Sequence, residues 1–166
     1  GEALYREAVA RFPAYTVANV HLAELERAHD PVSAAARLRA VMPLTADPEP
    51  AGLLSKILAT SDPEEAHALA SRTSASYEEL LLRHPFAFLD HAAEFHLRPG
   101  GDPARALALA RRNVENRPSA RALDIALEAA RAAGDREAEC ALTDRARSVV
   151  PTASLSASLA TTTCPR

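Results

Sequence analysis

The sequence predicts an all-α protein assembled from helical hairpins in series. Alanine supplies 38 of the 166 residues, whereas glycine supplies only 5 and aromatic residues 4%. Alanine is the best helix former and a poor residue for filling a strand, so this composition favours helices over sheets. Prolines also recur at a fixed interval, which is typical of a repeat protein.

The recurring prolines mark the ends of helices. Pro85, Pro118 and Pro151 are 33 residues apart in both steps. Pro13 precedes Pro85 by 72 residues, which is two periods of 36. The residue before a proline is disfavoured in the helical conformation, so helices tend to end there. Each period therefore holds two helices and the turn between them.

Aspartates that lie out of phase with these prolines mark helix starts. Aspartate is a good N-cap, and proline is well placed at the first helical position. Asp62 is also followed three residues later by Glu65, which is the capping-box spacing. Glycines before two of the aspartates combine a helix stop with the next start. The start signals are Asp30-Pro31, Asp62-Pro63, Gly100-Gly101-Asp102-Pro103 and Gly134-Asp135.

These signals bound nine helices. The first ends before Pro13, the next two are separated at Asp30, and a short helix and a long one flank Asp62. The last two pairs turn at Gly101-Asp102 and Gly134-Asp135. The predicted ranges are 2–12, 15–28, 31–41, 48–59, 63–83, 86–97, 103–116, 119–132 and 136–150.

The segment 152–163 is rich in serine and threonine, which are mediocre helix formers. Leu155 and Leu159 nevertheless have the i, i+4 spacing of a helix face. We expect a short capping helix here, and a disordered tail is the alternative.

Apolar residues follow the helical period within the predicted ranges. Leu123, Ala126, Leu127 and Ala130 fall at i, i+3, i+4 and i+7, so they form one stripe. Alanine on such stripes lets helices approach closely, and we expect each helix to pack tightly on its neighbours. Comparable stripes are Ala66, Leu69, Ala70, Tyr77 and Leu80; Ala104, Leu107, Ala110 and Val114; and Ala138, Leu142, Ala146 and Val149.

The charge balance argues against a nucleic-acid partner. The chain has 19 basic and 22 acidic residues, a net charge of −3, whereas nucleic-acid-binding domains carry a basic excess. No apolar run approaches the length of a membrane span and no targeting segment is visible, so the sequence predicts neither a membrane span nor a compartment. Cys140 and Cys164 form no metal spacing or disulfide framework, and Cys140 is expected to pack as a small apolar residue.

At the level of its repeats, the chain resembles the tetratricopeptide repeat (TPR) family, whose units of about 34 residues are helical hairpins closed by a proline. The best match is 86–118. Ala92 and Phe95 fall near the family's small and aromatic positions of the first helix, Ala106 and Ala110 lie on the second, and Pro118 closes the unit. The resemblance implies one domain over residues 1–166, folded as a right-handed α-α superhelix, or solenoid, of stacked helix–turn–helix repeats.

The repeats are degenerate, because the family's tryptophan-like start position is missing from all of them. A partial repeat at 2–13 looks like a second helix without its first. Repeats follow at about 14–47, 48–84, 85–117 and 118–150, with a C-terminal cap or tail at 151–166. The 48–84 unit departs from the pattern through a short first helix and an extended second one. The lone helix at 2–12 would expose an apolar stripe, so either the array continues or a second molecule covers it.

No arrangement for catalysis, a metal or a cofactor stands out. His91, Glu94 and His96 are close in sequence, but their spacing matches neither the His-x-x-Glu-His nor the i, i+4 histidine pattern of zinc enzymes. A solvated or groove-lining role is expected for these histidines. The sequence has no glycine-rich phosphate loop after a strand and no nucleophile-elbow glycines beside its serines. We therefore expect no enzyme, no cofactor and no metal site.

Polar residues on two predicted first helices are the candidate binding residues. In the TPR family, first helices line the concave groove that receives a peptide or a partner's helix. The resemblance therefore implies a scaffold or adaptor that binds a protein or peptide there, and ordinary solvated surface is the alternative. The candidates are Asp90, His91 and Glu94 on the helix 86–97 and Arg121, Asp124, Glu128 and Arg131 on the helix 119–132.

A second function stays open, which is self-assembly or a regulatory segment of a larger repeat protein. The terminal helices would then meet another copy, as in a homo-oligomer, or the continuation of a longer repeat array. The family's clamp for a C-terminal carboxylate uses lysine and asparagine on first helices. Asn19 is the only asparagine on a first helix and no lysine accompanies it, so recognition of that kind is not expected.

Overall fold

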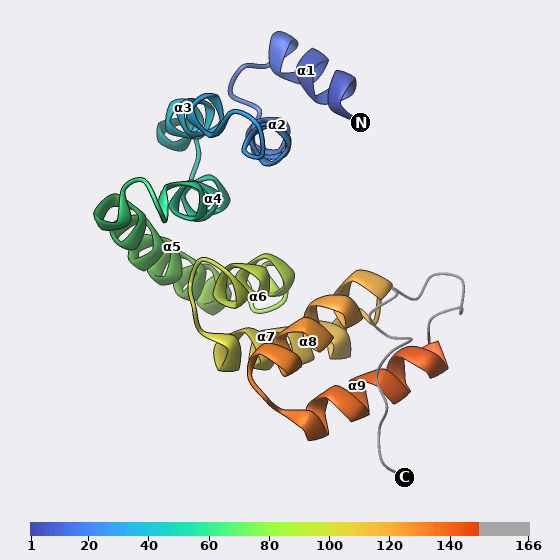
Figure 1. The fold of residues 1–166 in the computed structure, drawn as a ribbon. Coiled ribbons are helices and arrows are strands. Elements are labelled where there is room, and N and C mark those ends of the chain that lie inside the picture. The colour runs from blue at the N-terminus through green and yellow to red at the C-terminus, as the bar shows by residue number, and fades with distance from the viewer. Residues whose placement is uncertain (150–166) are drawn as a thin grey trace. The chain divides into compact units, whose positions relative to one another are not determined.

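The computed structural model describes residues 1–149, and over that range the protein is all-helical (Figure 1). No strand occurs within these residues. The helices are α1 (Glu2–Arg11), α2 (Thr16–Glu26), α3 (Pro31–Val41), α4 (Glu49–Leu58), α5 (Pro63–Arg83), α6 (Leu89–Leu97), α7 (Pro103–Asn116), α8 (Ala120–Ala132) and α9 (Arg136–Val149), with a 3₁₀ helix, η1, at Met42–Leu44. The prediction of an all-α fold is confirmed.

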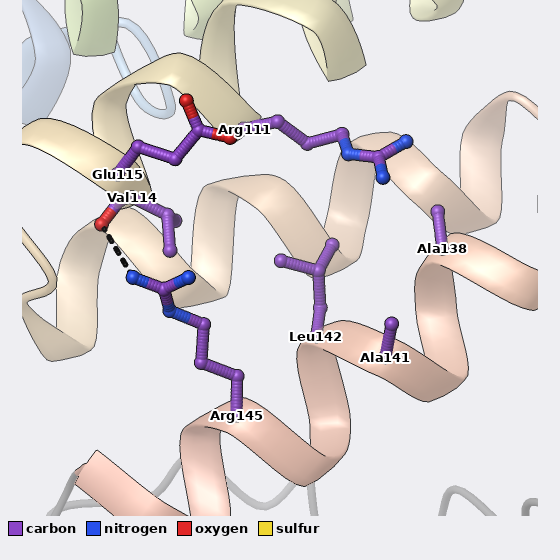
Figure 2. A pocket seen from close by; sticks show the side chains of 7 residues that line it. All are labelled: Arg111, Val114, Glu115, Ala138, Ala141, Leu142 and Arg145. Atoms are coloured by element: carbon purple, nitrogen blue, oxygen red, sulfur yellow. Dashed lines mark hydrogen bonds between the residues drawn. The ribbon is translucent and has the colours of Figure 1, made fainter.

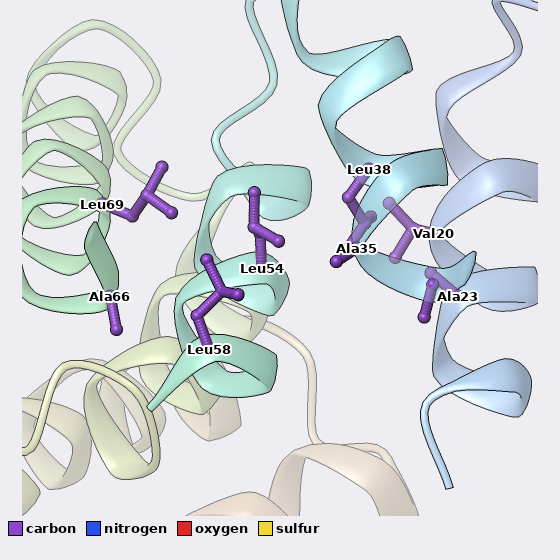
Figure 3. Packing of buried hydrophobic residues seen from close by; sticks show 9 residues of the cluster. Val20, Ala23, Ala35, Leu38, Leu54, Leu58, Ala66 and Leu69 are labelled. Carbon is purple, nitrogen blue, oxygen red and sulfur yellow. The ribbon is translucent and has the colours of Figure 1, made fainter. Parts of the chain in front are cut away.

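The chain divides into two compact units, the first ending at Tyr77 and the second beginning at Glu78. In the first unit, α1 contacts α2, α2 contacts α3, and α4 contacts both α2 and α3. A buried apolar cluster joins the elements from α2 to α5 (Figure 3). It includes Val20 and Ala23 of α2, Ala35 and Leu38 of α3, Leu54 and Leu58 of α4, and Ala66 and Leu69 of α5.

An ion pair ties α3 back to α2 beside this cluster. The Arg37 guanidinium donates to both carboxylate oxygens of Glu26, at 2.9 and 2.7 Å. The hydrogen bond from Arg37 lowers the pKa of Glu26, although burial of the carboxylate acts in the opposite direction. Glu26 is therefore held ionised at the end of α2, and the pair fixes how the two helices meet.

In the second unit, α6 contacts α7, α7 contacts α8 and α8 contacts α9, while α6 also contacts α8. The core contains fully buried leucines from successive helices, namely Leu89, Leu109, Leu123 and Leu127. Alanines fill the space between them, and Ala92, Ala93, Ala106, Ala126 and Ala130 are 0% exposed. Small side chains at these positions bring the helix backbones close together.

The predicted helix starts are confirmed by their capping hydrogen bonds. A carboxylate oxygen of Asp30, Asp62, Asp102 and Asp135 accepts the backbone N–H three residues later, at 2.9–3.0 Å. The end of α8 is a Schellman motif, in which Gly134 has a φ of 70° and the N–H of Asp135 reaches the Ala130 carbonyl at 2.9 Å. Glycine adopts this left-handed conformation without a steric penalty.

Three local expectations differ from the structure. Helix α6 begins at Leu89 and not at 86, because residues 84–87 form a turn in which the Ala87 N–H bonds to the His84 carbonyl. The 3₁₀ turn at Met42–Leu44 was not predicted. Cys140 is half-buried on α9 and disulfide-bonded, so the expectation of a simple apolar residue is wrong. The expected capping helix at 152–163 lies outside the described residues.

Replacing the capping residue Asp135 tests how the α8–α9 turn is held. We expect Asp135→Ala to lower the free energy of unfolding by about 1 kcal/mol, because the Ala138 N–H loses its acceptor. Asp135→Asn should retain most of the stability, since asparagine caps almost as well. Urea denaturation followed by circular dichroism measures both.

The matched control is Asp144→Ala on α9. The Asp144 side chain is 72% exposed and, within residues 1–149, forms a single ion pair, with Arg147 at 3.5 Å, so its loss should cost under about 0.5 kcal/mol. Equal losses for the variants at positions 135 and 144 would contradict the capping role.

Candidate functional site

Four charged side chains on neighbouring helices of the second unit form a connected surface network. The Arg98 guanidinium, just after the end of α6, donates to both carboxylate oxygens of Glu128 on α8, at 3.0 and 2.8 Å. Arg98 also lies 3.4 Å from the Glu94 carboxylate, which is paired with Arg121 of α8. We call Glu94, Arg98, Arg121 and Glu128 the α6–α8 charge network.

The network stays accessible to solvent. The side chains of Arg121 and Glu128 are 58% and 51% exposed, while those of Arg98 and Glu94 are 39% and 29% exposed. Exposed ion pairs contribute little to stability, typically under about 1 kcal/mol, because water screens them. Their charges remain available to exchange partners at small cost.

The network unites three of the sequence-predicted candidates, Glu94, Arg121 and Glu128. The sequence analysis missed Arg98, which joins them. Its position four residues after Glu94 is the spacing of a helix ion pair and was a usable signal. The bond to Glu128, thirty residues away, depends on the packing of α6 against α8 and leaves no local pattern.

Two other candidates lie at the opposite end of α6. The Asp90 carboxylate accepts from the Arg117 guanidinium at 3.2 Å and from the backbone N–H of His91 at 3.1 Å. The Asp90 side chain is only 13% exposed and His91 is half-buried. Asp90 is thus more enclosed than any member of the α6–α8 charge network.

The remaining candidates, Asp124 and Arg131, lie on α8. Asp124 is half-buried. The Arg131 Nε donates to the Glu139 carboxylate of α9 at 2.8 Å, and Arg136 pairs with the same carboxylate at 2.5 Å. The hydrogen bond from Arg131 lowers the pKa of Glu139, with Arg136 adding to the effect against the desolvation cost. Arg131 therefore helps to hold α8 against α9.

Asn19 is engaged within its own unit. Its amide nitrogen donates to the carbonyls of Pro13 and Tyr15, both at 2.9 Å, and its oxygen accepts from Arg37 at 3.4 Å. The side chain is 4% exposed. An amide bound in this way holds the start of α2 and is not presented to a ligand.

His96 is buried, so the expected solvated or groove-lining position is wrong for this residue. It is 5% exposed, its ring meets the edge of the Phe95 ring, and neither ring nitrogen has a hydrogen-bond partner within residues 1–149. Gly100 leaves room for it, because a Cβ there would lie 3.1 Å from the His96 Cα. The His96 ring is thus buried beneath the tight turn that follows α6.

Three charged groups face the His96 ring from neighbouring elements. Glu78 of α5 lies 3.8 Å from the Nε2 atom and is itself paired with Arg105 of α7, and Asp102 precedes α7. Burial lowers the pKa of His96, with Arg105 acting in the same direction and the two carboxylates opposing it. The folded protein thus favours a neutral imidazole, and the 3.8 Å contact is not an ion pair at neutral pH.

No group of three histidine, cysteine or acidic side chains suited to a metal occurs in the part of the chain that the structure describes. The second unit contains a cavity of about 200 Å³ between α7 and α9 (Figure 2). A second cavity of about 160 Å³ lies at the α8–α9 turn. Acidic residues lining the smaller cavity are engaged, because Asp135 caps α9 and Glu139 pairs with arginines.

No helix within residues 1–149 is long and apolar enough to cross a membrane. No family model and no curated protein matches the sequence of the chain.

The burial of His96 predicts a pH-dependent stability. A group whose folded-state pKa is depressed stabilises the fold in its neutral form, so the unfolded chain binds more protons as the pH falls. Stability should therefore decrease as the pH falls below about 6.5, the ordinary histidine value, until the lowered pKa of the folded protein is reached.

Urea unfolding at pH 7.5 and pH 5.0 measures this difference in the wild type. His96→Gln should reduce the loss of stability between pH 7.5 and pH 5.0, because the variant lacks the histidine whose pKa is lowered by folding. His67→Gln, which removes an exposed histidine of α5, should leave the loss unchanged. An identical pH dependence in His96→Gln and the wild type would contradict the assignment.

Proposed function

We propose that this chain is a non-enzymatic interaction module, a scaffold or adaptor that binds a peptide or a partner protein. In this proposal its hairpins are degenerate tetratricopeptide repeats that stack into a right-handed superhelix. The first helix of each hairpin lines the concave face, where the partner lies. The seven candidate residues on α6 and α8 belong to that face.

The order of helix contacts within each unit supports the proposal. In the first unit α2 contacts both α3 and α4, and in the second α6 contacts both α7 and α8. Helices α2 and α6 thus each meet the second helix of their own hairpin and also the first helix of the next hairpin. Stacked helical hairpins require this double contact, because one hairpin cannot bury its apolar faces alone.

The α6–α8 charge network is the observation that carries the proposed binding face. Arg98 bridges the Glu94 and Glu128 carboxylates across two first helices, so charges of both signs lie together over two repeats. A partner that carries both positive and negative charges can replace these exposed ion pairs with ion pairs to its own side chains. Such charges favour selectivity and rate of encounter more than affinity.

Affinity capture followed by mass spectrometry tests this face. We expect Glu94→Gln/Glu128→Gln to reduce recovery of the partners captured by the wild type by about threefold to tenfold. The control Glu2→Gln/Glu7→Gln changes the same charge on α1, where both residues form exposed pairs with arginines four residues away. Circular dichroism confirms that each variant is folded. Equal recovery by both double variants would move the binding face elsewhere.

Self-assembly through the terminal helices is the second candidate function, and α1 favours it. Helix α1 has no buried residue, although it packs on α2. Leu4 and Phe12 are 69% and 68% exposed, which leaves apolar surface at this end of the first unit. A second copy or a further repeat would cover that surface.

Sedimentation velocity over a wide range of concentrations tests self-assembly. A mass that grows with concentration in the wild type, and not in Leu4→Gln/Phe12→Gln, would support association through α1. The control is Leu44→Gln/Val32→Gln, which removes two other exposed apolar side chains of the same unit. A constant monomer mass would retire this candidate.

A further inference from the structure

The cavity between α7 and α9 has an apolar floor and charged side chains on its rim. Val114, Ala138 and Leu142 form the floor and are buried, whereas Arg111, Glu115 and Arg145 are exposed. Figure 2 shows Arg111 extending from α7 toward Ala138 and Arg145 extending from α9 toward Val114, with Leu142 between them. The cavity therefore presents an aliphatic surface with a guanidinium on either side.

Within residues 1–149, neither guanidinium group has a carboxylate partner. Arg145 donates to the backbone carbonyl of Val114 at 3.5 Å, near the limit for a hydrogen bond. Arg111 has no hydrogen bond or ion pair within residues 1–149. Glu115 is also unpaired there, although it lies one helical turn after Arg111. Most other arginines of the second unit are paired with carboxylates, so this rim differs from its surroundings.

The size of the cavity limits what it can hold. Its volume is about 200 Å³, below the roughly 300–1,000 Å³ typical of pockets for small molecules. One branched aliphatic side chain of a partner fits this space, while arginines on the rim suit carboxylates that flank it. Arginine is enriched at protein interfaces because its planar group binds a carboxylate through two hydrogen bonds.

We propose that the α7–α9 cavity binds an extended acidic segment of another protein, with one aliphatic side chain on Leu142 and flanking carboxylates on Arg111 and Arg145. This site lies on second helices, so it is separate from the binding face proposed above. The Glu115 carboxylate on the same rim repels an acidic ligand. Neutralising Glu115 should therefore strengthen binding, whereas neutralising Arg111 should weaken it.

The probe is the capped peptide acetyl-Glu-Ser-Leu-Ser-Glu-amide. Alternate side chains of an extended chain share one face, so both glutamates and the leucine point the same way. The uncharged match is acetyl-Gln-Ser-Leu-Ser-Gln-amide. Binding to the full chain is measured by titration in ¹H–¹⁵N NMR spectra, in which we expect shifts at Arg111, Ala138, Ala141 and Arg145 with the acidic peptide.

The variants distinguish a change in binding caused by altered charge from one caused by damage to the fold. Arg111→Gln breaks no hydrogen bond or ion pair within residues 1–149 and should weaken binding about threefold, whereas Glu115→Gln should strengthen it. Ala141→Glu adds a carboxylate at an exposed lining position and should abolish the shifts. The control Arg27→Gln/Arg72→Gln removes two arginines of the first unit that also lack carboxylate partners within residues 1–149, and should change nothing.

Several outcomes would overturn the proposal. These are equal binding of the uncharged peptide, unchanged binding by Arg111→Gln, an equal loss in the Arg27→Gln/Arg72→Gln control, or shifts confined to other helices. Loss of the shifts in Ala141→Glu together with tighter binding by Glu115→Gln would establish the site, whatever the fate of the face on α6 and α8.

Discussion

Close contact between helices through buried alanine faces is the constraint on which the rest of this structure depends. Ala18 and Ala23 on α2 and Ala92 and Ala93 on α6 are 0% exposed. Helices α2 and α6 have 11 and 9 residues, and isolated helices shorter than about 12–15 residues are marginal in water. These two helices are therefore stable only while a neighbouring helix covers their apolar stripes. An alanine buries little area, so stability depends on many close contacts and not on a few large side chains.

Alanine faces alone define the relative position of two helices weakly, because similar small side chains recur at every turn. Polar contacts between helices fix this relative position more closely. Arg37 binds both oxygens of Glu26 between α3 and α2, and Arg105 does the same with Glu78 between α7 and α5. The side chains of Arg37 and Glu26 are only 23% and 10% exposed, whereas those of Arg105 and Glu78 are 35% and 45% exposed. A largely buried pair such as Arg37–Glu26 contributes little net stability, but a shifted register would leave a desolvated charge without its partner. The pKa of Glu26 is lowered accordingly, which keeps the charge in place.

A feature of this structure could be predicted from the sequence only where a local pattern of residues marks it. The bounds of α3, α5 and α7 were predicted correctly, because a capping aspartate followed by proline fixes where each begins. The start of α6 was not, since residues 84–87 form a turn around Pro85 and no capping side chain marks the start of the helix after Phe88. The charged stripe on α8 was visible as helical spacing, yet Arg98 and the burial of His96 depend on contacts between helices that a sequence pattern does not encode.

The charges of the second unit fall into two energetic classes. In the α6–α8 charge network every member already has a partner of opposite sign, so a protein that bound there would exchange existing pairs for new ones. The net free energy of such an exchange is small, and the gain is in selectivity. At the α7–α9 cavity a carboxylate would meet guanidiniums that give up no ion pair, beside apolar surface that water leaves on binding. Affinity is therefore expected from second helices and discrimination from first helices, which assigns different roles to two faces of the same hairpins.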